Sequence, residues 1–313
     1  MKLKHYYLIT SVLFVLHTVL FVSTSWLVLL RILELIMIIL LFLRLQPLRR
    51  DNLVLFRYFL LQTLARICLV CFFIGIFNIY IARVVIFFKL VMPPFHVWLL
   101  MRIKFGDRKT FYWVIVIMKL PVIIMLQVLL VFFLEGYGSI LFLIITRGII
   151  SLLLLWRSGN LLYFLISSSF LHTLWTVLRL LIRKNIFLCY YSFYALVLFI
   201  LIWRIYGSFE FLVSNEWRWD VYLSLFIFSG APPSFMFLIK WSLLLRLIKI
   251  NIFIFLVFLV FSGISLYLYF RIMFTIILRA GESFQIFKKR NLSFLVFINL
   301  LGFLVWTIII QLS

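Results

Sequence analysis

Four ionisable side chains lie inside long apolar runs of this sequence, where the first chemistry to consider is proton transfer. They are Glu34 in WLVLLRILELIMIILLFL, Lys89 in VVIFFKLVMPP, Lys119 in VIVIMKLPVIIML and Lys240 in FMFLIKWSLLL. A charge inside a membrane costs from about 3 to more than 10 kcal/mol by different estimates, so such residues are functional candidates by default. The alternatives are a long side chain that reaches the membrane surface and a structural ion pair. Apolar residues on both sides of the lysines, and the short side chain of Glu34, favour the functional interpretation.

Two histidines belong to the same group of candidates. His172 lies in SSSFLHTLW, about one turn after Ser168 and Ser169, and His96 lies in MPPFHVW. Imidazole titrates near neutral pH, which suits a proton relay. A core histidine that hydrogen-bonds serine or a backbone carbonyl is an equally weighted alternative for His172. We count Ser168, Ser169 and His96 as accessory candidates.

Pairs of prolines accompany two of the lysines. Proline lacks an N–H group and breaks a helix, and the freed backbone groups are tolerated at membrane depth only inside protein or beside water. We therefore expect discontinuous helices next to Lys89 and Lys240. A lysine in such apolar surroundings releases its proton more easily, whereas a nearby carboxylate favours the charged form. The residues expected at the two helix breaks are Pro93, Pro94, Gly230, Pro232 and Pro233.

The elements that would hold these residues are membrane-spanning helices. The 313 residues are 67% hydrophobic and 12% charged, with a mean hydropathy of +1.27, whereas soluble chains are about half apolar and a quarter charged. Apolar runs of about 20 residues recur, the length that crosses a ~30 Å hydrocarbon core. The sequence predicts an all-α polytopic membrane protein with about eleven transmembrane helices. Their ranges are 6–24, 26–43, 53–75, 77–103, 111–134, 138–156, 160–182, 186–206, 221–247, 251–278 and 292–311.

The expected helix breaks divide this single membrane domain, 1–313, into two halves. They fall in the fourth and ninth spans, so the second would be inverted relative to the first. Transporters with inverted repeats place broken helices at corresponding positions of their halves. We expect one five-helix half at 1–134, another at 138–278, and an additional helix at 292–311.

The charge of the chain points to a membrane partner. Its 30 Lys and Arg against 8 Asp and Glu give a net charge of +22, which could indicate nucleic-acid binding. The basic residues lie mostly at the ends of apolar runs, however, as do anchors and orientation signals, so an anionic lipid such as cardiolipin is the expected partner. Cys68 and Cys71, in CLVC, lack further ligands, and no glycine-rich dinucleotide loop is visible. We therefore expect neither a metal nor redox chemistry in this chain.

Three motifs together carry a family resemblance. KLVMPPFHVW resembles Lys-x-Gly-x-Ala-Pro-Phe-His-x-Trp, FSGAPPSFMFLIKW resembles Gly-Gly-Leu-Pro-Pro-x-x-Gly-Phe-x-x-Lys-Trp, and SSSFLHTLW resembles Ser-Ser-x-x-His-x-Gly-Trp. These are motifs of the antiporter-like membrane subunits of NADH:ubiquinone oxidoreductase (respiratory complex I), in particular the chain 2 type of mitochondria. The resemblance runs from about residue 23 to about residue 245. It implies a proton-translocating subunit that couples electron transfer to pumping through a midplane chain of buried Lys, Glu, His and water.

The resemblance also assigns roles and surroundings. It implies that Glu34 couples to Lys89, that Lys119 relays protons between the halves, that Lys240 lies on the exit branch, and that His172 matches the family histidine. It implies no cofactor here, because FMN, iron–sulfur clusters and ubiquinone bind other subunits. The implied partners are a neighbouring antiporter-like chain, small membrane chains and accessory subunits. The implied location is the mitochondrial inner membrane, with the N-terminus in the matrix and the C-terminus in the intermembrane space.

Several arginines depart from the family pattern. Arg31 lies one turn before Glu34, where it could hold the carboxylate in a fixed ion pair. Arg66, Arg83 and Arg147 add charge inside apolar runs, and a permanently charged arginine cannot relay protons. These residues keep a non-pumping structural subunit open as an alternative. A third alternative is a stand-alone cation/proton antiporter.

Overall fold

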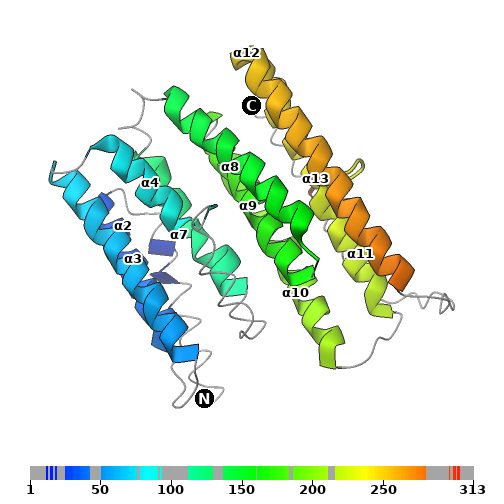
Figure 1. Cartoon of the computed structure of the whole chain (residues 1–313), viewed down its shortest axis with the longest axis horizontal. Coiled ribbons are helices and arrows are strands. Elements are labelled where there is room, and N and C mark those ends of the chain that lie inside the picture. Colours follow the sequence, from blue (N-terminus) through cyan, green and yellow to red (C-terminus); the bar gives the residue numbers. More distant parts are fainter. Residues whose placement is uncertain are drawn as a thin grey trace. The chain divides into compact units, whose positions relative to one another are not determined.

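The structure of the chain is a computed structural model. It describes residues 12, 15–16, 18–19, 25–42, 51–75, 78–90, 92–93, 112–129, 137–159, 161–182, 186–210, 216–279, 296, 299–300 and 302–303. Every regular element within these residues is a helix (Figure 1), which confirms the all-helical class expected from the sequence. Pro94 and His96 lie outside the described residues, as do most residues of the predicted spans 6–24 and 292–311.

The chain divides into two compact units, Met1–Arg147 and Gly148–Ser313. The first contains α2 (Trp26–Phe42), α3 (Asp51–Phe73), α4 (Ile79–Lys89), the π-helix η1 (Trp113–Ile117) and α7 (Lys119–Leu129). α2 packs on α3 and α7, and α4 also packs on α3 and α7. Leu29, Ile32 and Ile36 recur on one face of α2 and form an apolar cluster with Ile124 of α7, as expected of a helix with an apolar stripe.

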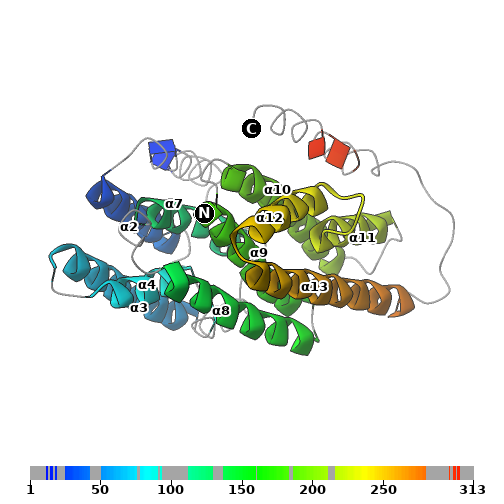
Figure 2. The same ribbon diagram turned by 90° about the horizontal axis from the view of Figure 1, so that it is seen from above.

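The second unit is built around α9 (Leu161–Ile182), in which every residue from Phe164 to Leu180 is buried. The other elements are α10 (Ile186–Glu210), α11 (Glu216–Ser229), α12 (Phe235–Ile250) and α13 (Ile252–Arg279), while the division between the units falls within α8 (Tyr137–Arg157). α10 packs on α9, α11 and α12, and α13 packs on α11 and α12 (Figure 2). A helix that is buried on all faces is a central element of its unit.

Three helices of the described residues are long and apolar enough to cross a membrane. These segments are Ile140–Arg157 in α8, Leu161–Ile182 in α9 and Ile252–Thr275 in α13. Their lengths of 18, 22 and 24 residues fit the roughly 20 residues that a hydrocarbon core requires. The count of about eleven spans and the inverted repeat remain predictions.

Prolines and glycines mark the ends of several helices. α4 ends at Lys89, where the Met92 N–H donates to the Phe87 carbonyl at 3.2 Å, and Pro93 follows. α11 ends at Ser229, and Gly230 to Ser234 are not helical. Gly230 has φ +72° and the Pro232–Pro233 peptide bond is cis. Ser234 caps α12 by accepting a hydrogen bond from the Phe237 N–H at 3.2 Å.

A π-helical turn precedes Lys119 and was not expected from the sequence. η1 ends at Ile117, and α7 begins at Lys119 with Pro121 in its first turn. A non-proline residue at 121 would donate its N–H to the carbonyl four residues earlier, at Ile117, and proline has no N–H to give. The change from π-helical to α-helical hydrogen bonding therefore falls between Ile117 and Pro121, where the N–H donor is missing. Such π-turns are frequent at functional sites.

Candidate functional site

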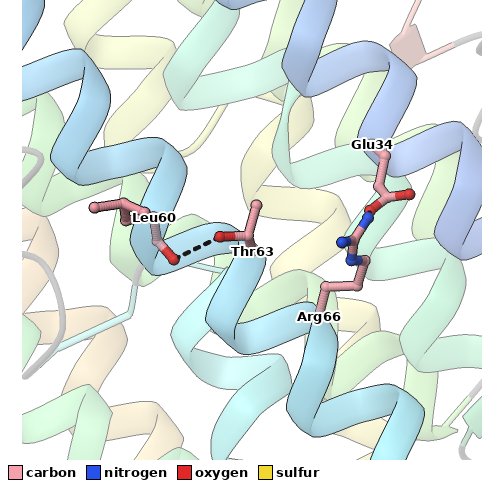
Figure 3. A network of polar contacts seen from close by, with 4 residues as sticks. All are labelled: Glu34, Leu60, Thr63 and Arg66. Atoms are coloured by element: carbon pink, nitrogen blue, oxygen red, sulfur yellow. Dashed lines mark hydrogen bonds and ion pairs between the residues drawn. The ribbon is translucent and has the colours of Figure 1, made fainter.

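Glu34 forms an ion pair with Arg66, which reaches it from the neighbouring helix α3 (Figure 3). Both side chains are about one-third exposed, at 30% and 35%. The Thr63 hydroxyl, one turn before Arg66, donates to the Leu60 carbonyl at 2.8 Å. The sequence allowed Arg31, one turn away, as a partner of this carboxylate. Arg31 is exposed, and the pairing cation comes from another helix.

Lys89 is the last residue of α4 and is buried, with 8% of its surface exposed. Arg66 lies close enough for the two cations to interact electrostatically. Arg66 thus pairs with the Glu34 carboxylate and also adds positive charge near the lysine; the coupling of Glu34 to Lys89 remains a prediction. The C-terminal end of α4 carries a partial negative charge that attracts the ammonium group.

Lys119 is almost completely buried, with 1% of its surface exposed. It opens α7 directly after η1, and the buried residues Ile115, Val116, Val122 and Ile123 lie close to it in the chain. Two buried arginines belong to the same unit. The Arg147 guanidinium stacks over the Phe87 ring at 4.0 Å, and the Arg83 guanidinium lies 5.3 Å from the centre of the Tyr80 ring. The intramembrane arginines that the sequence flagged are thus held partly by aromatic faces, which attract cations.

Lys240 turns back from α12 toward the end of α11. Its Nζ donates to the Ser229 carbonyl at 3.1 Å and lies 5.9 Å from the centre of the Trp175 ring. A Cβ on Gly230 would approach Nζ to 2.9 Å. Glycine is favoured at 230 for two reasons: its backbone has a positive φ, and an added Cβ would collide with the Lys240 side chain.

His172 hydrogen-bonds two tyrosines in the interior of the second unit. Its Nδ1 lies 2.7 Å from the Tyr190 hydroxyl on α10, and its Nε2 lies 3.3 Å from the Tyr269 hydroxyl on α13. The hydroxyls of Ser168 and Ser169 donate to the carbonyls of Leu165 and Ile166, and Ser168 also hydrogen-bonds Tyr269. The accessory serine thus reaches the histidine through a tyrosine.

Arg179, two turns after His172 on α9, is a site residue that the sequence reading left out. It is 3% exposed, its Nη2 donates to the Ile239 carbonyl, and its guanidinium lies 4.8 Å from the centre of the Tyr190 ring. It is also close enough to Lys240 for the two cations to interact. Its sequence signal was a basic residue near the end of the apolar run 160–182.

Asn299 was also missed, and it holds the junction between α11 and α12. Its Oδ1 accepts a hydrogen bond from the Phe235 N–H at 2.8 Å, and its Nδ2 donates to the Pro233 carbonyl at 3.2 Å. A Cβ on Gly302 would lie 2.6 Å from the Phe235 ring, so this C-terminal segment contacts the start of α12. One asparagine therefore satisfies both a donor and an acceptor that the helix break leaves open.

Six of the described site residues form two groups, each within one unit. In the first, Arg66 pairs with Glu34 and is close enough to Lys89 to interact with it. In the second, Arg179 contacts the ring of Tyr190, which hydrogen-bonds His172, and is close enough to Lys240 to interact with it. Among the described residues, no three His, Cys, Asp or Glu side chains are placed to hold a metal ion. Each group combines basic side chains with tyrosines, serines or a carboxylate, all of which can bind or release protons.

Comparisons with known proteins give a fold but no sequence family. No family model matches the chain, and no curated protein matches it. A chain in a solved structure of respiratory complex I from Thermus thermophilus with bound aureothin is similar, with a TM-score of 0.67 at 17% identity. The match covers 90% of this chain and 72% of that one. The two chains therefore share a fold over nearly the whole of the present sequence.

Proposed function

We propose that this chain is an antiporter-like membrane-arm subunit of NADH:ubiquinone oxidoreductase, of the chain 2 type found in mitochondria. Two independent observations support the proposal. The fold resembles that of a chain in a bacterial complex I structure, and the stretches around Lys89, His172 and Lys240 resemble motifs of the family. The chain would belong to a proton-translocating reductase whose FMN, iron–sulfur clusters and ubiquinone bind elsewhere. Other membrane-arm chains, accessory subunits and anionic lipid such as cardiolipin would be its partners.

Within that complex, the chain would carry protons through its buried basic residues. The observation that carries this proposal is the burial of three lysines, Lys89, Lys119 and Lys240, at 8%, 1% and 5% exposure. Lysine, unlike arginine, can exchange a proton when it is buried. His172, with a tyrosine hydroxyl on each ring nitrogen, would add a group that can accept a proton on one side and release it on the other.

A specific observation also favours a second candidate, a structural subunit that does not pump. Arg66 pairs with Glu34 and lies beside Lys89. A carboxylate held by a permanent cation does not alternate between partners, and a permanent cation cannot pass on a proton. On this alternative, the chain would keep the shape of the family and connect its neighbours in the membrane arm.

The proposed placement is the mitochondrial inner membrane, with about eleven spans. Three helices of membrane length support a multi-pass protein. The basic residues of the loops 44–50, 102–109 and 279–291 support an N-terminus in the matrix and a C-terminus in the intermembrane space. The two inverted halves, 1–134 and 138–278, would place corresponding helix breaks after Lys89 and before Lys240.

The deciding experiment replaces Lys119 with methionine in the assembled complex. Complexes with Lys119→Met, and with Lys249→Met as a control on an exposed lysine of α12, would be reconstituted in liposomes. NADH oxidation and proton uptake would be measured together. A pumping role predicts that Lys119→Met lowers turnover or protons per NADH while the control does not. Normal values for Lys119→Met in a fully assembled complex would favour the structural role. Detection of the chain outside any complex would contradict both.

A further inference from the structure

A cavity of about 230 Å³ opens in the second unit where α8 ends and α9 begins, beside the last turns of α13. Trp156, Leu161, Arg271 and Thr275 are among the residues that line it. Three of these residues lie at ends of the three membrane-length segments. Trp156 is next to the last residue of Ile140–Arg157, Leu161 is the first residue of Leu161–Ile182, and Thr275 is the last residue of Ile252–Thr275. The cavity therefore lies at the level where hydrocarbon gives way to lipid headgroups.

The polar groups of this cavity favour an anion. Arg271 is exposed, with its guanidinium 5.5 Å from the centre of the Trp156 ring, and Arg157 is exposed nearby in the last turn of α8. The Ser158 and Thr275 hydroxyls already donate to backbone carbonyls at 2.6 and 2.8 Å. The other donors include the guanidinium, the Trp156 indole N–H and the first N–H groups of α9, which lie at the positive end of that helix. No acidic residue lines the cavity among the described residues.

An exposed apolar surface continues from the cavity along α8 and α13. On α8 it consists of Trp156, Leu153 and Ile149, and on α13 of Tyr267, Ile264 and Val260. Each set recurs every three or four residues and so shares one helix face. The Trp156 and Tyr267 rings lie 6.1 Å apart, so the two faces adjoin. A Cβ on Gly148 would meet the Phe261 ring, so this side chain of α13 reaches α8 at Gly148.

The length of the surface selects one kind of occupant. From Arg271 to Val260, α13 advances about 16 Å at 1.5 Å per residue. One leaflet of a bilayer has about 15 Å of hydrocarbon, half of a ~30 Å core. A cationic cavity with Trp and Tyr at its mouth, above an apolar surface one leaflet deep, matches a phospholipid from headgroup to chain ends.

We propose that this surface binds one anionic phospholipid, with its phosphate in the cavity beside Arg271 and its acyl chains along α8 and α13. Arg271 supplies charge and hydrogen bonds to the phosphate oxygens. Trp156 holds the guanidinium in place from one side, and the apolar faces of the two helices receive the chains. The site requires a membrane location but neither pumping nor a particular partner chain.

The test counts bound lipid on the assembled protein. Complexes carrying the wild-type chain, Arg271→Gln, Arg271→Lys or the control Lys249→Gln would be equilibrated in nanodiscs of phosphatidylcholine with phosphatidylglycerol. Retained lipid would be counted by native mass spectrometry after mild detergent release. The wild-type chain should retain one phosphatidylglycerol. Arg271→Gln should bind this lipid about 5-fold more weakly, the change expected for one basic side chain at a membrane surface, and should lose it during release. Arg271→Lys should keep most of it, and Lys249→Gln should change nothing.

Four other results would overturn the proposal. Equal losses in Arg271→Gln and Lys249→Gln would mean a diffuse surface charge and no site. Equal retention of phosphatidylcholine would mean that the anionic headgroup is not recognised. Displacement of the lipid by inorganic phosphate alone would indicate an ion site without a role for the apolar faces. Cross-linking of an Ile264→Cys variant to a neighbouring polypeptide would show that protein covers this surface.

Discussion

Replacing Gly230 with alanine should destabilise the junction between α11 and α12, and Lys240 should account for much of the effect. The backbone at 230 has φ +72°, which costs a residue with a side chain about 1–2 kcal/mol. The new Cβ would also lie 2.9 Å from the lysine Nζ, so the ammonium must leave the Ser229 carbonyl. A hydrogen bond that involves a charged group contributes about 1.5–3 kcal/mol. We therefore expect a total loss of roughly 3–4 kcal/mol, since the lysine can find part of its bonding elsewhere.

The two contributions can be separated with Gly75, which has φ +88° and no neighbouring atom within 4 Å of an added Cβ. Gly75→Ala should lose only the backbone contribution, about 1–2 kcal/mol. Gly230→Ala in a Lys240→Met background should fall toward that value, because the ammonium that competes for the space is gone. Unfolding in mixed detergent micelles, followed by circular dichroism, would be measured for the wild type, Gly230→Ala, Lys240→Met and the double variant. The four free energies of unfolding give the coupling between positions 230 and 240. If Gly230→Ala costs the same with Lys240 and with Met at 240, the reasoning about the lysine is refuted.

Three further predictions concern other contacts of the site. Arg66→Gln should lower the free energy of unfolding by about 1 kcal/mol after screening by water, and adding Glu34→Gln should recover most of it; no recovery in the double variant would contradict the ion pair. Asn299→Leu leaves a part-buried N–H and an exposed carbonyl without their partner, which costs about 1 kcal/mol because water can replace part of the bonding. Amide exchange at the start of α12 should therefore accelerate more than at the start of α9, and equal rates would argue against the cap. Tyr190→Phe removes the 2.7 Å contact to His172 and should shift the NMR signal of Nδ1 more than that of Nε2, whereas an unchanged Nδ1 would exclude the bond.

Long apolar runs made several helices predictable within a few residues. The ranges 138–156 and 160–182 correspond to Tyr137–Arg157 and Leu161–Ile182, and 186–206 corresponds to Ile186–Glu210. The prediction succeeded there because a run of apolar residues between polar residues defines both the length and the ends of such a helix. The π-turn before Lys119 escaped because periodicity does not report a local change in hydrogen-bond spacing.

The partners of the site residues were less predictable than the residues themselves. Arg31 was the obvious choice for Glu34 because it lies one turn away, whereas Arg66 reaches the carboxylate only through the packing of α3 on α2. The same reason applies to Asn299, which is 64 residues away from Phe235 in sequence. Types and burial of charged residues follow from local sequence, but contacts between distant helices follow from tertiary packing.

The buried arginines have a consequence for electrical insulation. Arg83, Arg147 and Arg179 are 2%, 4% and 3% exposed, and each carries a guanidinium, the side chain least suited to pass on a proton. A fixed positive charge in a poorly screened interior repels sodium and potassium ions that would otherwise follow polar groups across the bilayer. On the proposed function, the buried arginines of each unit would oppose a leak of metal cations across the membrane, whereas histidine and tyrosine side chains could still exchange protons.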